Sequence, residues 1–582
     1  MRTFTFKGLL LTAVFMLLGC LSIQAANDDL ITKQITIKLD KAGTLPNKIA
    51  ISEMYKITNL KIIGEINGTD WNFIREMAGR DFNGEKTDGK LSILDLSEAK
   101  IVAGGDAYVR FSENYYYYTS NDKLGDYVFY GCSGFTSLTL PSSVTSIGRG
   151  AFYGCWKLTS LTIPSGVTSI GYSAFRGCSG LTSLTIPSSV TEISDDAFKG
   201  CSGLTSMIIP SGVTAIGRET FSGCSGLTSL TIPSSVTSIG ESAFEWCSGL
   251  TSLTLPSSVT SIGDKAFYSC WMLNSLTIPS SVTSIGDEAF EACSGLTSLI
   301  IPSGVTSIGK SAFRDCSGLT SLTLPSSVTS IGDYAFAGCS GLTSLTIPSG
   351  VTSIGGGTFW GCWKLTSLTI PSGVTSIGNY TFTGCSGLTS LTLPSGVTSI
   401  GDYAFQDCSG LTSLTLPSGV TSIGICAFYD CSGLTSLTIP SSVTSIGDKA
   451  FYGCSELTSL TIPSSVTEIG WGAFRGCSGL TSIYVYPENL PELGIDIFTG
   501  CDAKNCTVYV PKGTYDAYKS SEFGYFEKIV EFDATGIDKV TTSTNAKEVS
   551  RYSVNGQRLV GPTKGLNIVK YSDGSVKKVA VE

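Results

Sequence analysis

The sequence contains no histidine, and only 15% of its 582 residues are charged. Histidine is the commonest general acid/base and the commonest metal ligand, so its absence excludes a Ser-His-Asp or Cys-His catalytic site. The formal net charge is −9, whereas a non-specific nucleic-acid-binding protein needs a basic face. We therefore expect no catalytic residues, no cofactor, no metal and no nucleic-acid partner.

Long hydrophobic runs are also scarce, and the one that exists lies at the N-terminus. Arg2 and Lys7 stand beside an apolar run from Leu9 to about Ile23, which Gln24-Ala25-Ala26 follows. A basic start, a short apolar core and small residues at the end predict a signal peptide over residues 1–25. We therefore expect an exported protein, either secreted or held at the cell surface of the outer membrane.

A second interpretation of the same segment is a lipoprotein signal. Leu17-Leu18-Gly19-Cys20 has the form of a lipobox in which Cys20 is lipidated, although Leu18 stands where a small or β-branched residue is usual. No other stretch is long and apolar enough to cross a membrane. A lipid on Cys20 would then be the only membrane attachment of a chain that we otherwise expect to be a monomer.

The dominant feature of the chain is a 23-residue repeat with the pattern C-S-G-L-T-S-L-T-I-P-S-S-V-T-S-I-G-D-x-A-F-x-G. A period of 20–29 residues with regularly placed leucines is typical of a leucine-rich solenoid. In one unit, Leu158, Leu161 and Ile163 alternate with hydroxyl residues, so we expect a strand with these three facing inward. Gly171 then turns the chain, and we expect a brief helical piece at Ala174-Phe175. The predicted fold is a β-rich, right-handed α/β-type leucine-rich repeat solenoid.

The repeat also sets the domain boundaries. Residues 26–123 do not follow the 23-residue period and are predicted to form an N-terminal cap, with a strand at 35–39 and a short helix at 71–77 that Asp70 would cap. The solenoid spans residues 124–500, and a C-terminal cap with a short helix at 515–518 spans 501–533. A linker at 534–547 leads to a small all-β domain at 548–582, where Asn-Gly and Asp-Gly predict hairpin turns.

The cysteines in the repeat admit three interpretations: disulfides, metal ligands or buried free thiols. Residues in register point the same way, so disulfides would distort the stack, and metal ligation lacks histidine. We favour a structural ladder of buried free thiols, with Cys426 as a candidate for an exposed thiol and Cys501–Cys506 as a candidate disulfide. The ladder comprises Cys132, Cys155, Cys178, Cys201, Cys224, Cys247, Cys270, Cys293, Cys316, Cys339, Cys362, Cys385, Cys408, Cys431, Cys454 and Cys477.

An acidic column follows the turn glycine in many repeats. Stacked carboxylates could bind calcium, but Arg149, Arg218 and Lys310 occupy the same column, so we expect each carboxylate to cap the A-F turn that follows it. The column contains Asp126, Asp195, Glu241, Asp264, Asp287, Asp333, Asp402 and Asp448.

Variation among the repeats gathers around the I-G-x-x-A-F-x-x-C turn, and much of it is aromatic. Exposed aromatic side chains are favoured anchors for proteins and for sugar rings, although several could simply cover the edges of the coils. The candidate ligand-contacting residues are Trp246, Trp271, Trp360, Trp363, Trp471, Tyr334 and Tyr403, with Tyr172, Tyr380 and the run Tyr115-Tyr116-Tyr117-Tyr118 as further candidates.

The paired I-G-x-x-A-F and C-x-x-L elements of residues 124–500 resemble the BspA-like, Treponema-type leucine-rich repeat. The sequence from Val510 to Tyr518 resembles the usual ending of such arrays. The tail, from Tyr552 to Arg558 and on to Val581, is similar to the C-terminal sorting domain of Bacteroidetes type IX secretion. This resemblance implies a surface or secreted protein of an anaerobic Bacteroidetes organism, in a family described as adhesins for host matrix proteins and other bacteria.

Three functions remain open from the sequence. The first is a non-catalytic adhesin-like protein whose partner is a host extracellular matrix protein or another bacterial surface. The second is a glycan-binding protein for attachment or nutrient capture, and the third is a structural surface spacer. The variable aromatic turn favours the first two, whereas the uniform Thr-Ser-Thr strand face favours the third.

Overall fold

The structure is a computed structural model that describes residues 29–112, 115–533, 548–553, 558–561, 565–571 and 576–581. Its two compact units, residues 1–396 and residues 397–582, are described in turn. The predicted signal peptide with Cys20, the linker at 534–547 and both hairpin turns of the tail lie outside the described residues. In the described part, no helix has the length and apolarity that crossing a membrane requires.

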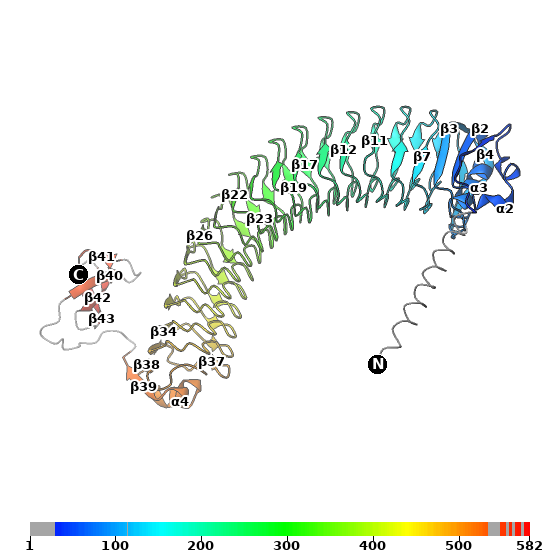
Figure 1. Cartoon of the computed structure of the whole chain (residues 1–582). Coiled ribbons are helices and arrows are strands. Elements are labelled where there is room, and N and C mark those ends of the chain that lie inside the picture. The colour runs from blue at the N-terminus through cyan, green and yellow to red at the C-terminus, as the bar shows by residue number, and fades with distance from the viewer. Residues whose placement is uncertain are drawn as a thin grey trace, which may run out of the picture. The chain divides into compact units, whose positions relative to one another are not determined.

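Unit 1 begins with strands that belong to the same sheet as the repeats. β1 (Ile35–Lys38), β2 (Asn59–Ile66) and β3 (Ile93–Ile101) pair in parallel, and β3 pairs in the same way with β7 (Ser137–Thr139). Figure 1 shows β2 and β3 beside β7 at one end of the stack. The region therefore covers the end of the solenoid by continuing its sheet with irregular coils.

The remaining elements of this region lie between those strands in the chain or follow β3. They are the 3₁₀ helix η1 (Leu45–Asn47), the helices α2 (Ile51–Met54) and α3 (Gly68–Met77), the antiparallel hairpin of β4 (Gly104–Ser112) and β5 (Tyr115–Thr119), and β6 (Lys123–Leu124).

The prediction for α3 was wrong in its start and its cap. The helix begins at Gly68, three residues earlier than predicted, and Asn67 is the N-cap. Asp70 is the third helical residue, and its Oδ2 accepts a hydrogen bond from the Asn67 amide at 3.0 Å, which completes a capping box. Asp70 is fully buried. The cost of burying its carboxylate is offset because it also accepts hydrogen bonds from the amides of Gly43 and Leu45, at 2.6 and 2.9 Å.

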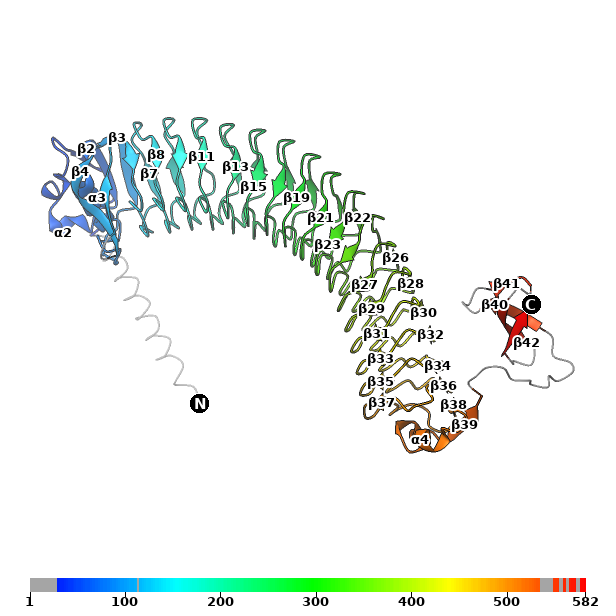
Figure 2. The same cartoon turned by 180° about the vertical axis from the view of Figure 1, so that it is seen from behind.

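Each regular coil of unit 1 has two short strands, except that the coil of Ser183 has only an isolated bridge to Ser206 in place of its first strand. Figures 1 and 2, seen from opposite sides, both label strands of the two kinds. The first strands are β7, β9 (Ser160–Thr162), β12 (Ser206–Ile208), β14 (Ser229–Thr231), β16 (Ser252–Thr254), β18 (Ser275–Thr277), β20 (Ser298–Ile300), β22 (Ser321–Thr323), β24 (Ser344–Thr346), β26 (Ser367–Thr369) and β28 (Ser390–Thr392). The second strands are β8 (Ser146–Ile147), β10 (Ser169–Ile170), β11 (Glu192–Ile193), β13 (Ala215–Ile216), β15 (Ser238–Ile239), β17 (Ser261–Ile262), β19 (Ser284–Ile285), β21 (Ser307–Ile308), β23 (Ser330–Ile331), β25 (Ser353–Ile354) and β27 (Ser376–Ile377).

The core of unit 1 consists of columns of identical side chains, as predicted. In the coil of β9, Leu158, Leu161 and Ile163 are buried while Ser160 and Thr162 are exposed. The phenylalanines stack through the coils with ring centroids 5.1–5.8 Å apart in unit 1. The predicted helical piece at Ala174-Phe175 was wrong, because this segment is a turn in which the Phe175 amide donates to Ala197 O of the next coil at 2.8 Å.

The cysteine ladder is also a hydrogen-bond ladder. Cysteines along the ladder donate to the carbonyl of the phenylalanine 26 residues earlier, as Cys155 Sγ does to Phe129 O at 3.2 Å and Cys293 Sγ to Phe267 O at 3.1 Å. The cysteines of residues 132–506 are free and buried. Cys426, which we expected to be exposed, is only 6% exposed, and Cys501 and Cys506 do not form a disulfide. A cysteine at this position of the coil supplies a weak S–H hydrogen-bond donor, which an alanine would lack.

Unit 2 repeats the coil and then closes the stack. Its first-strand sheet ends in the parallel order β34-β36-β38-β39, and α4 confirms the predicted helix near 515–518. The strands are β29 (Ser399–Ile400), β30 (Ser413–Thr415), β31 (Ser422–Ile423), β32 (Ser436–Thr438), β33 (Ser445–Ile446), β34 (Ser459–Ile462), β35 (Glu468–Ile469), β36 (Ser482–Val485), β37 (Glu492–Leu493), β38 (Thr507–Pro511) and β39 (Lys528–Phe532), with the helices α4 (Tyr515–Lys519) and η2 (Glu522–Tyr525). The tail has its own antiparallel sheet of β40 (Glu548–Ser553), β41 (Arg558–Leu559), β42 (Gly565–Tyr571) and β43 (Val576–Val581).

The buried thiols predict that the protein loses stability in alkali. Burial raises the pKa of Cys201 from its ordinary value of 9.0 to about 12. Above about pH 9 the unfolded chain therefore ionises this thiol while the folded chain does not, so the free energy of unfolding falls as the pH rises from about 9 to about 12. Urea unfolding across this range under reducing conditions measures the slope.

The control for this prediction is Cys201→Ala. Removing one such thiol should make the loss of stability shallower by about 1.4 kcal/mol per pH unit in the affected range. An unchanged slope would show that the thiol at this position does not contribute to the alkaline loss.

Candidate functional site: the turn edge

The turn edge is the row of turns between the glycine after the second strand and the cysteine of each coil, for example Gly286–Cys293. Four positions of each turn vary, and in this coil they are Asp287, Glu288, Glu291 and Ala292. We name them the first, second, third and fourth variable positions.

The second and fourth variable positions have left-handed backbone conformations in every coil. Glu288 has φ 57° and Ala292 has φ 59°. Glycine accepts such angles without a steric penalty, and it occupies the fourth position in many coils. A bulky residue with positive φ is a genuine outlier.

The turn edge has its own ladder of backbone hydrogen bonds between coils. The amide of Glu288 donates to Lys310 O at 2.8 Å, the amide of Phe290 to Ala312 O at 2.9 Å, and the amide of Ala292 to Arg314 O at 2.7 Å. Backbone groups outside the two short strands are thereby satisfied. The variable side chains consequently project from a backbone that is fixed coil by coil.

The acidic column caps backbone amides, but not the ones we predicted. Asp287 Oδ1 accepts from the amide of Lys310, the equivalent residue in the next coil, at 2.7 Å. Asp126 accepts from Arg149 in the same way, at 2.8 Å. The predicted cap within the same turn is wrong, because the second variable position turns left-handed there while the neighbouring coil presents an amide. In the described residues, no group of three or more Cys, Asp or Glu side chains is arranged to hold a metal ion.

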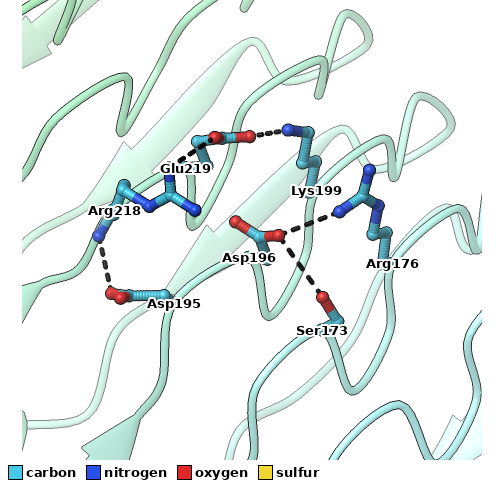
Figure 3. A network of polar contacts seen from close by, with 7 residues as sticks. All are labelled: Ser173, Arg176, Asp195, Asp196, Lys199, Arg218 and Glu219. Atoms are coloured by element: carbon cyan, nitrogen blue, oxygen red, sulfur yellow. Dashed lines mark hydrogen bonds and ion pairs between the residues drawn. The ribbon is translucent and has the colours of Figure 1, made fainter.

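One stretch of the turn edge carries a buried carboxylate. Asp196, at a second variable position with φ 57°, is 1% exposed. Its Oδ2 lies 2.9 Å from Nη1 of Arg176 and accepts the hydroxyl of Ser173 at 3.4 Å, both from the preceding coil (Figure 3).

The next coil extends this charge network. Glu219 pairs with Lys199 of the preceding coil and with Nη1 of Arg218 in its own coil, the latter at 3.3 Å (Figure 3). Cations at third positions thus alternate with anions at second positions over three coils. These charges are already paired with one another, so they tie coils together and leave little for a ligand.

The aromatic candidates lie on the turn edge or next to it, and Trp271 and Trp363 directly follow the cysteine that ends a turn. Trp246, Trp271, Trp360, Trp363 and Trp471 are exposed, whereas Tyr334 and Tyr403 are half-buried. Tyr115, Tyr116 and Tyr118 on β5 are also exposed. In unit 2, the ring of Trp471 receives Nζ of Lys449 at 4.4 Å, a cation–π contact within the protein.

Two groups of these aromatic residues come together in unit 1. The first is the Trp246 cluster, in which the rings of Trp246 and Trp271 meet edge to face with centroids 5.9 Å apart and Tyr268 contacts Trp246 at the same separation. Met272, which follows Trp271 in the chain and is exposed, is counted with this cluster. The second group, Tyr334, Trp360 and Tyr380, borders a hollow. Sequence reasoning identified most of these residues but missed Tyr268, Met272 and the strain at Trp246. A signal of the strain was present in the sequence, because the column of Trp246 otherwise holds small residues and aspartate.

The family model described as "BspA type Leucine rich repeat region (6 copies)" matches residues 113–228, 214–329, 306–412 and 398–523. The chain belongs to this family. A search of curated proteins returned no match. Among solved structures, a leucine-rich repeat protein from Bacteroides ovatus is 34% identical, with a TM-score of 0.54 over 63% of this chain and 88% of that chain.

Two further solved structures are similar in sequence to this BspA-type chain. A leucine rich cell surface protein from Faecalibacterium prausnitzii is 33% identical, with a TM-score of 0.36 over 56% of this chain and 85% of that chain. A leucine-rich repeat protein from Eubacterium ventriosum is 28% identical, with a TM-score of 0.37 over 55% of this chain and 82% of that chain.

The charge network predicts that the buried ion pair of Asp196 with Arg176 stabilises the contact between neighbouring BspA-type coils. Asp196→Asn keeps the side-chain shape and suits the left-handed backbone, but it removes the charge that faces Arg176. We expect the free energy of unfolding to fall by about 1–2 kcal/mol, as measured by urea unfolding. Asp315→Asn, at an exposed left-handed position 3.6 Å from Arg314, should cost less than about 0.5 kcal/mol. Equal small effects at the two positions would contradict this role for Asp196.

Proposed function

We propose that this BspA-type chain is an exported, non-catalytic scaffold that binds another protein through its turn edge. The partner is a host extracellular matrix protein or a protein on another bacterial surface. The observation that carries the proposal is the Trp246 cluster, where a tryptophan stands in a strained backbone position and remains exposed to solvent.

Trp246 is costly at its position. It has φ 59° at the fourth variable position, and the left-handed conformation costs a non-glycine residue roughly 1–2 kcal/mol. Strained residues that are kept despite such a cost are concentrated at functional sites. Its edge-to-face contacts with Tyr268 and Trp271 recover part of this energy, yet 46% of its surface stays in water.

The surroundings of Trp246 suit a protein partner. Trp271 and Met272, which follow Cys270 where most other coils have Ser-Gly, are 45% and 50% exposed. Tryptophan is over-represented among the residues that dominate binding energy in protein interfaces, and methionine adapts to irregular surfaces. Glu241, Asp264 and Asp287 are exposed along the same row of coils, so electrostatic complementarity favours a partner with basic residues around an apolar centre.

Export is supported by the sequence at both ends. The N-terminal pattern, with its two interpretations of cleavage near Ala25 or lipidation at Cys20, directs the chain across a membrane. The tail sheet β40–β43 supports a separate C-terminal domain, which we propose to serve as a sorting signal of the type IX kind. The domain boundaries given above belong to this proposal.

Replacing Trp246 with glycine tests whether this side chain contributes to binding or to the stability of the fold. Trp246→Gly relieves the backbone strain and loses aromatic contacts, so we expect the free energy of unfolding to stay within about 1 kcal/mol of the wild type. Affinity for a purified matrix glycoprotein that the wild type binds should fall at least about tenfold. Surface plasmon resonance on a panel of such glycoproteins measures the affinity.

The matched control is Ser269→Gly, which makes the same backbone change at the fourth position of the next coil. It should leave binding unchanged. If Trp246→Gly destabilises the protein by several kcal/mol without weakening binding, the tryptophan is structural. If the folded wild type binds no protein of the panel, the spacer function is favoured.

A further inference from the structure

The second aromatic group surrounds a hollow in the turn edge of unit 1. The hollow has a volume of about 480 Å³. Its lining comes from four consecutive coils, whose second strands are β21, β23, β25 and β27, and consists of Lys310, Ser311, Arg314, Tyr334, Trp360 and Tyr380. This volume is within the range of small-ligand sites.

One coil beside the hollow lacks side chains where its neighbours have large ones. Gly356 and Gly357 occupy the first and second variable positions, between coils that carry Tyr334 and Tyr380 at the second position. A Cβ on Gly357 would overlap Cε1 and Cδ1 of Tyr334, so the ring of Tyr334 lies against this glycine. The glycine pair is not part of the lining, but it lets the Tyr334 ring lie over this coil, beside the hollow.

Trp360 adds a third aromatic side chain to the lining, and it comes from the same coil as Gly356 and Gly357. It lies at the third variable position and is 42% exposed. Aromatic faces offer an apolar body with a polar edge, which suits the C–H face of a sugar ring lying between hydroxyl groups.

The charged residues that line the hollow are both cations. Lys310 occupies the first variable position, which an acid holds in many coils, and it makes no ion pair in the described part of the chain. Arg314 is held over the ring of Tyr334, with its guanidinium carbon 6.0 Å from the ring centre.

Acidic residues stand behind Arg314 but do not line the hollow. Arg314 Nε lies 3.9 Å from Glu291 Oε1 and 3.6 Å from Asp315 Oδ2. These carboxylates orient the guanidinium and offset part of its charge. Lys310 is thus the cation whose charge is available to bind a ligand.

We infer that this hollow binds a carboxylated sugar, with the sugar ring against Trp360 and its carboxylate at Lys310 and Arg314. Aromatic surfaces beside an unpaired ammonium and a guanidinium match a pyranose that carries one negative charge. The site is separate from the Trp246 cluster, so the chain has a carbohydrate site in addition to the proposed protein-binding surface.

The test uses the full chain and trigalacturonic acid in isothermal titration calorimetry, with neutral galactotriose for comparison. We expect the acidic trisaccharide to bind at least about tenfold more tightly than the neutral one. Lys310→Asp, which restores an acid common in this column, should reduce that affinity at least tenfold, and added salt should also weaken it.

Gly357→Tyr fills the hollow with the side chain that the flanking coils carry. It should abolish binding of the acidic trisaccharide. Its matched control is Gly150→Tyr, because Gly150 has φ 55° at the second variable position and a Cβ there would lie 2.6 Å from the Tyr127 ring. The control has the same backbone strain away from the hollow and should bind like the wild type.

Three outcomes would overturn the inference. These are no binding by the folded wild type to trigalacturonate, glucuronate or sialyl oligosaccharides, equal binding of acidic and neutral sugars, or equal loss in both tyrosine variants. Trp246→Gly should leave sugar binding unchanged, so failure of the sugar site and failure of the protein-binding proposal are distinguishable.

Discussion

The backbone hydrogen bond between equivalent residues of neighbouring coils is the interaction on which the rest of this structure depends. It forms in both strand rows, as between Ser206 and Ser229, and again along the turn edge, where Ala292 donates to Arg314. Because the repeat length is fixed at 23 residues, inward-facing side chains such as the phenylalanines meet their own kind 23 residues away. Phenylalanine stacks on phenylalanine, and a cysteine thiol donates to the phenylalanine carbonyl of the preceding coil, as Cys293 does to Phe267.

This register separates what must be constant from what is free to vary. Side chains that face inward repeat because an altered residue would disturb two neighbours in a close-packed column. The side chains at the variable positions of the turn edge, many of them exposed, stand on a backbone bonded to both neighbouring coils. A ligand site can therefore arise from very few changes, as where Gly356 and Gly357 interrupt a row that holds Tyr334 and Tyr380.

Much of the fold was predictable from the sequence because the period, the leucines and the phenylalanines recur without interruption. The capping network of α3 was not, since the partners of Asp70 come from Gly43 and Leu45, far away in the chain. The role of the acidic column was misjudged because its acceptor amide lies in the next coil. The aromatic residues were visible in the sequence, but the left-handed backbone at Trp246 and the hollow at Gly357 appear only in three dimensions.

Native-state hydrogen exchange tests the central claim most directly, which is that the turn edge is a bonded ladder and not a row of loose loops. The amides to compare are those of Phe290 and Ala292, which donate to the next coil, and that of Leu299 in strand β20. The account predicts protection factors for the two turn amides within about tenfold of the strand amide. Exchange of the turn amides at the rate of an unstructured chain, with the strand still protected, would contradict it.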